Sequence, residues 1–212
     1  MLGACNASCI RRSDPVLQPR KIALFGGTFD PVHLGHRHMA ELAVREFGLD
    51  EVRFIPCRIS PHKQESPPAS PEDRLAMLRL AMADVPWAVI DDLELMREGA
   101  SFSYETAELM KARFPTAKLF WIMGGDQWKA LPRWKHPERL ARCVEFIVIS
   151  RGGKVVPREH FLMHIITNEH PASATEVREA VGCEGKSHQW LSPAVARYIQ
   201  EHGLYRGSST HP

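Results

Sequence analysis

Short runs of apolar residues alternate along this chain with longer stretches in which apolar residues recur at the spacing of a helix face. The runs are nearly continuous in apolar character, which is typical of strands that are covered on both faces of a sheet. They predict strands at residues 22–25, 51–56, 87–93, 119–123, 145–150 and 164–167. Strands that alternate with helices in this way favour an α/β fold: a doubly wound, Rossmann-like parallel sheet in a single domain.

Capping residues mark where the intervening helices begin and end. Ser70 followed by Pro71 is typical of a helix start, Gly48 of a helix end, and Ser173 with Glu176 of a capping box. Together with the apolar spacing, these signals predict helices at residues 34–47, 74–82, 103–114, 173–181 and 193–203. The segments 58–69 and 151–159 are predicted to be irregular, and the first is long enough to be functional.

Composition adds mainly exclusions. The 212 residues are 44% apolar and 25% charged, which is ordinary for one soluble globular domain. A net charge of +2 does not indicate a nucleic-acid or membrane partner. No apolar run reaches the roughly 18 residues of a membrane span, and residues 1–20 lack the apolar centre of a signal peptide. We therefore expect a cytoplasmic protein with a flexible extension at 1–20 and a disordered tail at 207–212.

The cysteines do not predict a metal site. All five are scattered, and Cys5 and Cys9 have no second Cys or His pair at a matching spacing. Reduced cysteines at the edges of apolar runs, such as Cys57 and Cys143, behave as small hydrophobic residues.

Candidate chemistry begins where the first predicted strand ends, in the stretch GGTFDPVHLGH at residues 26–36. Ligands of open parallel sheets bind beyond the carboxyl ends of the strands, where glycines allow close approach and helix N-termini attract anions. His33 and His36 are three residues apart, so both can face one side of a first helical turn and donate to phosphate oxygens, and Thr28 adds a hydroxyl. Neither the P-loop nor the GxGxxG pattern is present. The alternative is a local cap at His33 and an exposed His36.

A second candidate anion site lies at the start of the helix predicted at 173–181. Ser173 and Thr175 stand at its first turn, and Arg178 follows one turn later. This arrangement suits phosphate binding, but an ordinary capping box followed by a surface arginine explains it equally well.

These motifs resemble one family. GGTFDPVHLGH resembles the signature of the HxGH nucleotidyltransferases and, among them, is most similar to bacterial nicotinate-nucleotide adenylyltransferases. Further stretches are similar to that family in the same order: SPHK at 60–63, ELMREGASFSYET at 94–106, IMGGDQWKALPRW at 122–134, VISRGG at 148–153, SATEVREAV at 173–181 and YIQEHGLYR at 198–206. The resemblance implies a nucleotidyltransferase domain at 21–206 that transfers AMP from ATP to nicotinate mononucleotide and releases pyrophosphate.

The resemblance also implies roles for individual residues. In-line attack on the α-phosphorus needs alignment and charge neutralisation and no covalent enzyme intermediate. The expected catalytic residues are His33, His36, Lys63 and Arg178, and the expected ATP-binding residues are Gly26, Gly27, Thr28, Phe29, His33, His36, Arg151, Ser173, Thr175 and Arg178. Mg²⁺ is expected to arrive with ATP, so no metal site on the protein is predicted.

The acceptor side departs from the family pattern at two positions. Phe102 replaces the family's tyrosine and Ala100 its proline, while Ser103 keeps the hydroxyl. The expected acceptor-binding residues are Ser103, Tyr104, Asp126, Trp134 and Lys135, with Trp134 stacking on the pyridine ring and Lys135 favouring a carboxylate over an amide. Gly152 replaces the proline of the family's Arg-Pro-Gly triplet, which weakens the assignment of Arg151. Trp121 lies inside a strand and is expected in the core.

Several alternatives remain open. The closest is an adenylyltransferase that prefers nicotinamide mononucleotide. A pantetheine-phosphate adenylyltransferase and a cytidylyltransferase fit the motifs less well. Alternatives from other classes are a catalytically silent nucleotide sensor and a tRNA-binding protein. The expected partners are ATP and nicotinate mononucleotide, with no nucleic acid and no membrane, and the expected state is a monomer or a small homo-oligomer.

Overall fold

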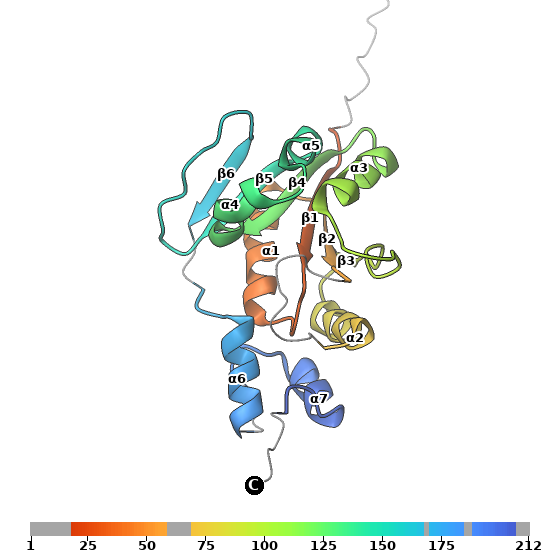
Figure 1. The fold of residues 1–212 in the computed structure, drawn as a ribbon, viewed down its shortest axis with the longest axis vertical. Helices are drawn as coiled ribbons and strands as arrows, with labels where there is room; N and C mark the ends of the chain where they lie inside the picture. Colours follow the sequence, from red (N-terminus) through yellow and green to blue (C-terminus); the bar gives the residue numbers. More distant parts are fainter. Residues whose placement is uncertain (1–17, 59–68, 168–169, 185–187, 207–212) are drawn as a thin grey trace, which may run out of the picture.

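The described residues form six strands, which lie parallel in one sheet flanked by helices on both faces (Figure 1). The computed structural model describes residues 18–58, 69–167, 170–184 and 188–206, without the side chains of 183 and 184. The strands are β1 (Lys21–Gly27), β2 (Glu51–Pro56), β3 (Ala88–Ile90), β4 (Lys118–Gly124), β5 (Glu145–Ser150) and β6 (Met163–Thr167). Their order, β3-β2-β1-β4-β5-β6, is that of a Rossmann-type sheet, so the predicted fold class is confirmed.

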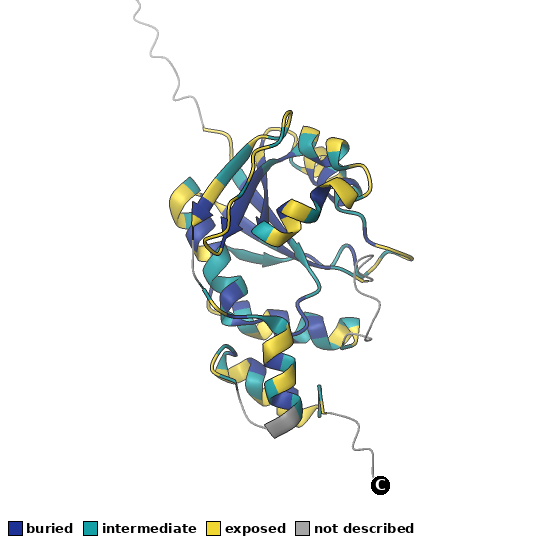
Figure 2. Cartoon of the chain, turned by 60° about the vertical axis from the view of Figure 1, so that its left-hand side comes forward, coloured by how far each residue is buried: buried dark blue, intermediate teal, exposed yellow. Residues whose placement is uncertain are grey.

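Alternate residues of each central strand enter two separate cores, as Figure 2 shows by the dark strands between helical layers. In β1, Ala23 and Phe25 join one core, and Ile22 and Leu24 join the other. The first core is covered by α1 (Leu34–Phe47), α2 (Pro71–Met82), α6 (Ala174–Glu184) and α7 (Pro193–Glu201); the second by α3 (Ser103–Arg113), α4 (Gly125–Ala130) and α5 (Pro137–Cys143). Burial on both faces explains the unbroken apolar runs of the strands.

The predicted element boundaries are close to the observed ones where the sequence signals are strong. The segments 34–47, 51–56 and 145–150 coincide with α1, β2 and β5. Strand β3 is shorter than the predicted 87–93 and ends at Ile90. The N–H of the next residue, Asp91, still donates to the carbonyl of Phe54 (3.0 Å), and its carboxylate accepts hydrogen bonds from Arg53 and Arg113. Three short helical elements between β4 and β5, namely α4, η1 (Leu131–Arg133) and α5, were not predicted.

The C-terminal part of the fold reaches back to the start of α1. In Figure 1, α6 and α7 lie beyond the lower end of the sheet, next to α1 and α2. The carbonyl of Trp190 accepts a hydrogen bond from the N–H of Leu34 (2.8 Å), and the hydroxyl of Tyr205 donates to the carboxylate of Asp30 (2.7 Å). The chain from α6 onward therefore belongs to the same single domain as the sheet.

The predicted extension and tail fall almost entirely outside the described residues, as do Cys5 and Cys9. Within the described part of the chain, no helix combines the length and the apolar character needed to span a bilayer.

Candidate active site

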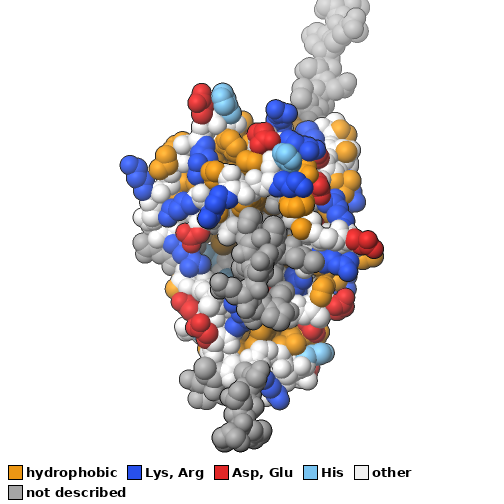
Figure 3. Space-filling view, in the orientation of Figure 1, with side chains coloured by type: hydrophobic (Ala, Val, Ile, Leu, Met, Phe, Trp, Pro, Cys, Tyr) orange, Lys and Arg blue, Asp and Glu red, His pale blue; other side chains and the backbone are white. Residues whose placement is uncertain are grey.

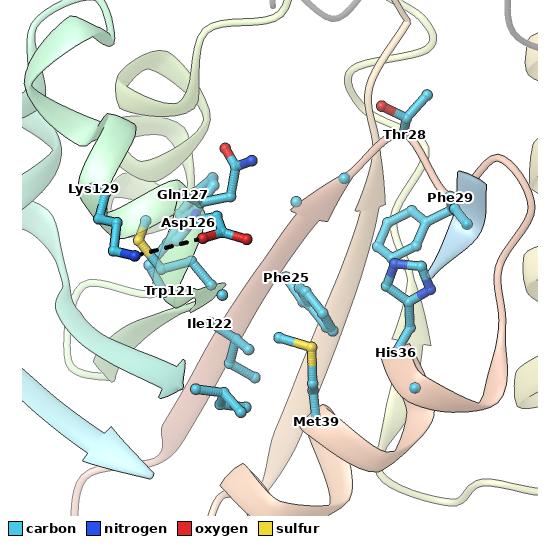
Figure 4. Close-up of a pocket in the computed structure, with 18 of the residues that line it drawn as sticks. Phe25, Thr28, Phe29, His36, Met39, Trp121, Ile122, Asp126, Gln127 and Lys129 are labelled. Carbon is cyan, nitrogen blue, oxygen red and sulfur yellow. Dashed lines mark ion pairs between the residues drawn. The ribbon is translucent and has the colours of Figure 1, made fainter. Parts of the chain in front are cut away.

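A cavity of about 1060 Å³ opens at the carboxyl edge of the sheet, between the ends of β1 and β4. The strand order reverses between these two strands, and this reversal point is where ligands of doubly wound sheets bind. The starts of α1, α3, α4 and α6 also line the cavity. Figure 4 shows His36 of α1 and Asp126 of α4 among the lining residues. Among the described residues, five cationic side chains line it against three acidic ones, and Lys and Arg side chains flank this part of the surface in Figure 3. The cavity is thus suited to an anionic ligand.

The glycine turn at the end of β1 fits closely against aromatic rings. A Cβ atom added at Gly26 would lie 3.0 Å from the indole of Trp121, and one at Gly27 would lie 3.2 Å from the ring of Phe29. Trp121 is buried and also lines the cavity, so it belongs both to the core, as predicted, and to the floor of the site. Larger residues at the two glycines would displace the turn.

Gly35, between the two histidines, lies close to other side chains of the protein. A Cβ atom there would lie 2.9 Å from Nδ1 of His33 and 3.0 Å from Cβ of Ala172. The space that the glycine leaves is therefore filled by the protein itself, which brings the start of α1 close to the start of α6.

His33 and His36 lie where the sequence places them, on one side of the first turn of α1. Their rings stack at a centroid distance of 3.8 Å and an angle of 29°. The N–H of His33 donates to Nδ1 of His36 (3.2 Å), so a neutral His36 carries its proton on Nε2. Phe29, whose own ring is buried, lies edge-on to His36 at 5.1 Å (Figure 4). Phe29 therefore fixes the imidazole that is expected to contact the ligand.

The protonation state of His33 follows from its surroundings. Burial, followed by the positive charge of Arg151 and by His170 and His188, lowers the pKa of His33 to about 4. A neutral imidazole can still make two hydrogen bonds, one as a donor and one as an acceptor. His33 thus enters the site uncharged at neutral pH, and a bound polyanion would favour its protonation.

The start of α6 lies beside the histidines on the same wall of the cavity. Ser173 and Thr175 line the cavity, as predicted. Arg178 is not among the lining residues; its Nη1 donates to the carbonyl of Asp30 (2.7 Å) and its Nη2 to Oγ1 of Thr175 (3.4 Å). Arg178 therefore joins α6 to the turn that follows β1 and stands behind the wall.

Arg151 lines the cavity at the end of β5, and its Nη2 donates to the carbonyl of Ala172 (2.8 Å). The next residue, Gly152, has a φ of +86°. A proline, whose ring fixes φ near −65°, has no access to that conformation. The glycine that departs from the family triplet is therefore required by the backbone of this chain.

Across the cavity lie residues predicted to bind the acceptor. Asp126, at the start of α4, has a side chain that is 97% exposed and lies 3.9 Å from Nζ of Lys129. The indole of Trp134 is half-buried and meets Trp121 edge-on at 6.5 Å, while Nζ of Lys135 lies 4.1 Å from the ring centre of Phe102. Ser103 lines the cavity at the first residue of α3.

Besides Arg178, one further predicted site residue of the described chain does not line the cavity. Tyr104 is buried away from it: its ring packs beside Arg139 at 4.4 Å and His136 at 5.1 Å, and its hydroxyl donates to Glu105 (2.7 Å). The first turn of α3 directs this side chain toward α5, so the structure does not support Tyr104 as a side-chain contact for the acceptor. Lys63 lies outside the described residues.

Several lining residues were missed by sequence reasoning. Glu94 is 4% exposed and accepts a hydrogen bond from Oγ1 of Thr106 (2.6 Å), and its burial raises its pKa. His170 lines the cavity near Arg151, and its Nδ1 accepts from the N–H of Ala172 (3.2 Å). Glu94 is the first residue of a stretch that resembles the family, but the resemblance does not assign it a role. No sequence signal marks His170.

The sequence of this chain is similar to those of known nucleotidyltransferases. The family model described as cytidylyltransferase-like matches residues 24–180. A probable nicotinate-nucleotide adenylyltransferase of Neisseria meningitidis serogroup C (strain FAM18) is 37% identical over 200 residues, covering 88% of this chain and 98% of the relative. The nicotinate-nucleotide adenylyltransferase of Bacillus subtilis (strain 168) is 36% identical over 186 residues, with the same coverage of 88% and 98%.

Solved structures share the fold. Nicotinic acid mononucleotide adenylyltransferase of Plasmodium falciparum, complexed with NaAD, superposes with a TM-score of 0.73 at 19% identity, covering 88% of this chain and 97% of that one. The same enzyme complexed with APC gives a TM-score of 0.72 at 20% identity, with the same coverage of 88% and 97%. At this level of identity the likeness concerns the arrangement of the elements.

Proposed function

Because the chain belongs to the nicotinate-nucleotide adenylyltransferases of the cytidylyltransferase-like family, we propose that its cavity binds ATP and nicotinate mononucleotide together and joins them into deamido-NAD. The enzyme transfers AMP from ATP to the acceptor in NAD biosynthesis. The observation that carries the proposed site is the stacked pair His33 and His36 at the point where the strand order reverses. At about 1060 Å³ the cavity reaches the upper end of the usual range for small-molecule sites, which leaves room for two nucleotides.

ATP binds, in this proposal, between the turn after β1 and the start of α6. We call this wall the ATP side; it comprises Gly26, Gly27, Thr28, Phe29, His33, His36, Arg151, Ser173 and Thr175, with Arg178 behind it. Two helix N-termini and the cation of Arg151 converge there, and such groups attract phosphates. Because Arg178 donates hydrogen bonds to Asp30 and Thr175, its main proposed role is to hold this wall in place.

The acceptor binds across the cavity. We call this wall the acceptor side; it comprises Ser103, Asp126, Trp134 and Lys135. Trp134 offers a face to the pyridine ring, Asp126 an acceptor for ribose hydroxyls, and Lys135 a positive charge for the ring carboxylate. Phe102, the residue before α3, provides no side-chain cap, which leaves the first N–H groups of α3 to the ligand.

The proposed chemistry is one in-line displacement. A phosphate oxygen of nicotinate mononucleotide attacks the α-phosphorus of ATP, a new P–O bond forms, and the bond to the bridging oxygen breaks as pyrophosphate leaves. His36, with its Nε2 proton, donates to the α-phosphate as charge accumulates there, and such a donor is worth roughly 3–4 kcal/mol. Holding both nucleotides in line contributes on the order of 7–11 kcal/mol more. No side chain forms a covalent bond to the substrate.

We also propose that Mg²⁺ is carried by ATP. Among the described residues no group of three or more His, Cys, Asp or Glu side chains is placed to hold a metal ion. The carboxylate of Asp30, which lines the cavity, already accepts hydrogen bonds from Tyr205 and from the N–H of Ala69. Phosphate oxygens and water suit Mg²⁺ as ligands, and the ion would offset the triphosphate charge.

The reaction is proposed to take place in the cytoplasm, in a monomer or small homo-oligomer without a nucleic-acid partner.

The experiment that tests this function is pyrophosphate release with Mg-ATP and either nicotinate mononucleotide or nicotinamide mononucleotide. We expect kcat/KM for the acid to exceed that for the amide at least tenfold, about 1.4 kcal/mol of discrimination. Equal values would keep the chemistry and reject the acceptor assignment. If neither acceptor released pyrophosphate while ATP still bound, the chain would be a nucleotide sensor.

A further inference from the structure

Arg74 is a charged residue that the reaction as described does not use. It lies near the start of α2 and is fully buried, with 0% of its surface exposed. Arginine is almost never buried to this degree unless it is paired. The partners of this guanidinium therefore decide what the residue does.

Every hydrogen bond that the guanidinium makes to the described residues goes to a backbone carbonyl. Its Nη1 donates to Thr28 (2.8 Å) and Cys57 (2.8 Å), its Nε to Ala69 (3.0 Å) and its Nη2 to Arg58 (3.3 Å). Thr28 follows β1, Cys57 and Arg58 follow β2, and Ala69 precedes α2. One side chain thus joins three separate segments of the chain at the carboxyl edge of the sheet.

Two of these segments form the ATP side and its border. Thr28 and Cys57 line the cavity, and Thr28 marks the end of β1 in Figure 4. Sγ of Cys57 lies 3.8 Å from Oγ1 of Thr28, so the two segments are in direct contact. The same guanidinium nitrogen therefore fixes the backbone at two adjoining points of the cavity wall.

The charge of Arg74 has no carboxylate partner within 4.0 Å among the described side chains. Burying a cation against carbonyl dipoles alone is costly, and a well-packed apolar side chain is often at least as stabilising as a buried ion. A positive charge with no carboxylate bonded directly to it, behind the wall of an anion-binding cavity, however, attracts the anion through a medium of low dielectric constant. The cost to the free protein is thus offset when a polyanion binds.

We propose that Arg74 is a positioning residue for the triphosphate: it holds the turn after β1 against the end of β2, and its charge strengthens ATP binding from behind the cavity wall. This inference rests on the proposed function, because it assigns the anion as ATP. Arg74 does not line the cavity, so it acts through Thr28 and its neighbours and not by contact.

The test compares Arg74→Lys and Arg74→Met with a control on the same helix, Arg79→Met. The side chain of Arg79 is 63% exposed and lies 3.9 Å from Asp92, so its loss changes the net charge equally without touching the cavity. For each protein, the Kd of a non-hydrolysable ATP analogue is measured by calorimetry, KM is measured for ATP and for nicotinate mononucleotide, and thermal unfolding is recorded.

We expect Arg74→Lys to weaken binding of the ATP analogue about tenfold, because lysine keeps the charge but not the planar set of donors. Arg74→Met should weaken it further, by about 30-fold or more, and lower Tm. In both variants KM for ATP should rise in step with Kd while KM for the acceptor changes less than about twofold. Arg79→Met should leave all three constants unchanged.

Folded variants that bind ATP as the wild type does, with only Tm reduced, would show that Arg74 is purely structural and overturn the proposal. So would a parallel rise in KM for both substrates, or a failure of both variants to fold. The calorimetric readout keeps this test separate from the proposed function. If the wild type binds ATP but releases no pyrophosphate, the function fails while the inference about Arg74 is still decided.

Discussion

The two walls of the cavity differ in what holds their side chains. On the ATP side, His33 is 7% exposed and is stacked on His36, and the turn that precedes it is fixed by the fully buried Arg74. On the acceptor side, the side chain of Asp126 is 97% exposed, and Lys135 rests on Phe102 at the surface. One wall is held by the core of the sheet, and the other is carried by short helices and loops.

This difference matches the demands of the two substrates. The displacement at phosphorus requires donors that are already in place when charge develops, and buried groups meet that need because they do not reorganise. Recognition of the acceptor requires only that one pyridine ring with its substituent bind more tightly than another. Exposed side chains can supply the small difference in binding free energy that this requires. Loss of a donor on the ATP side that acts in the transition state, such as His36, should therefore change kcat, and substitutions on the acceptor side should change KM for the acceptor and substrate preference.

The largest effect is expected for His36→Ala. Loss of the Nε2 donor should lower kcat by about 10²–10³-fold with both acceptors alike, because the missing hydrogen bond forms in the transition state. Steady-state pyrophosphate release measures it, with His160→Ala, whose side chain is 86% exposed, as the matched control. A loss confined to one acceptor would contradict the division between the two walls.

A pH effect of slightly smaller size is expected on stability. The pKa of His33 is about 4 in the folded protein and 6.5 when unfolded, so the unfolded chain binds more protons between these values. The free energy of unfolding should therefore rise with pH over this window, by up to about 3 kcal/mol from this group, and should fall as pH decreases from 6.5 toward 4. Urea titrations at pH 4.5 and 7 measure the change, and His33→Asn should show a smaller difference between them. An equal difference in the variant would exclude His33 as its source.

Trp134→Ala should affect one substrate only. Loss of the ring stack should raise KM for nicotinate mononucleotide about tenfold, close to 1.4 kcal/mol, while KM for ATP stays within about twofold. Trp134→Phe keeps an aromatic face and should recover most of the affinity. Equal increases in both KM values would indicate that the indole supports the whole cavity through Trp121, which it meets edge-on.

The smallest effect is expected for Lys135→Ala. An exposed charge pair contributes about 0.2–1 kcal/mol, so the ratio of kcat/KM for acid over amide should narrow by at most about fivefold. Lys129→Ala is the control, since Lys129 lines the same wall but lies beside Asp126. If the ratio of kcat/KM for acid over amide did not change, Lys135 would not contribute to the preference for the acid. The backbone at the start of α3 would then account for that preference.

The ATP side was also the wall that the sequence predicted best. Its residues follow strand and helix signals that are local: an apolar run, a glycine turn and two histidines at helical spacing place His33 and His36 without knowledge of the rest of the fold. The same holds for Ser173 and Thr175 at a capped helix start. These local signals suffice because strand ends and helix starts meet at one edge of a parallel sheet.

The acceptor side was predicted less completely because tertiary contacts decide it. The elements α4, η1 and α5 have only six, three and seven residues, and isolated helices of that length are not stable. They are held by Trp128, Leu131 and Leu140 in the core, which no local pattern reveals. Tyr104 was expected to meet the ligand, and the direction of α3 relative to α5 turned it inward. The role of Arg74 was equally hidden, because a lone arginine in a helix normally predicts a solvated side chain.

The bond between Tyr205 and Asp30 has a consequence for how the protein is made. It joins residues that are 175 positions apart, so a ribosome completes the turn after β1 long before the residue that holds it is synthesised. Likewise, the N–H of Leu34 can form its hydrogen bond to the carbonyl of Trp190 only after Trp190 has been synthesised. A growing chain therefore has the histidines of the active site before it has their final support, and the nucleotide site is complete only after Trp190 and Tyr205 have been synthesised.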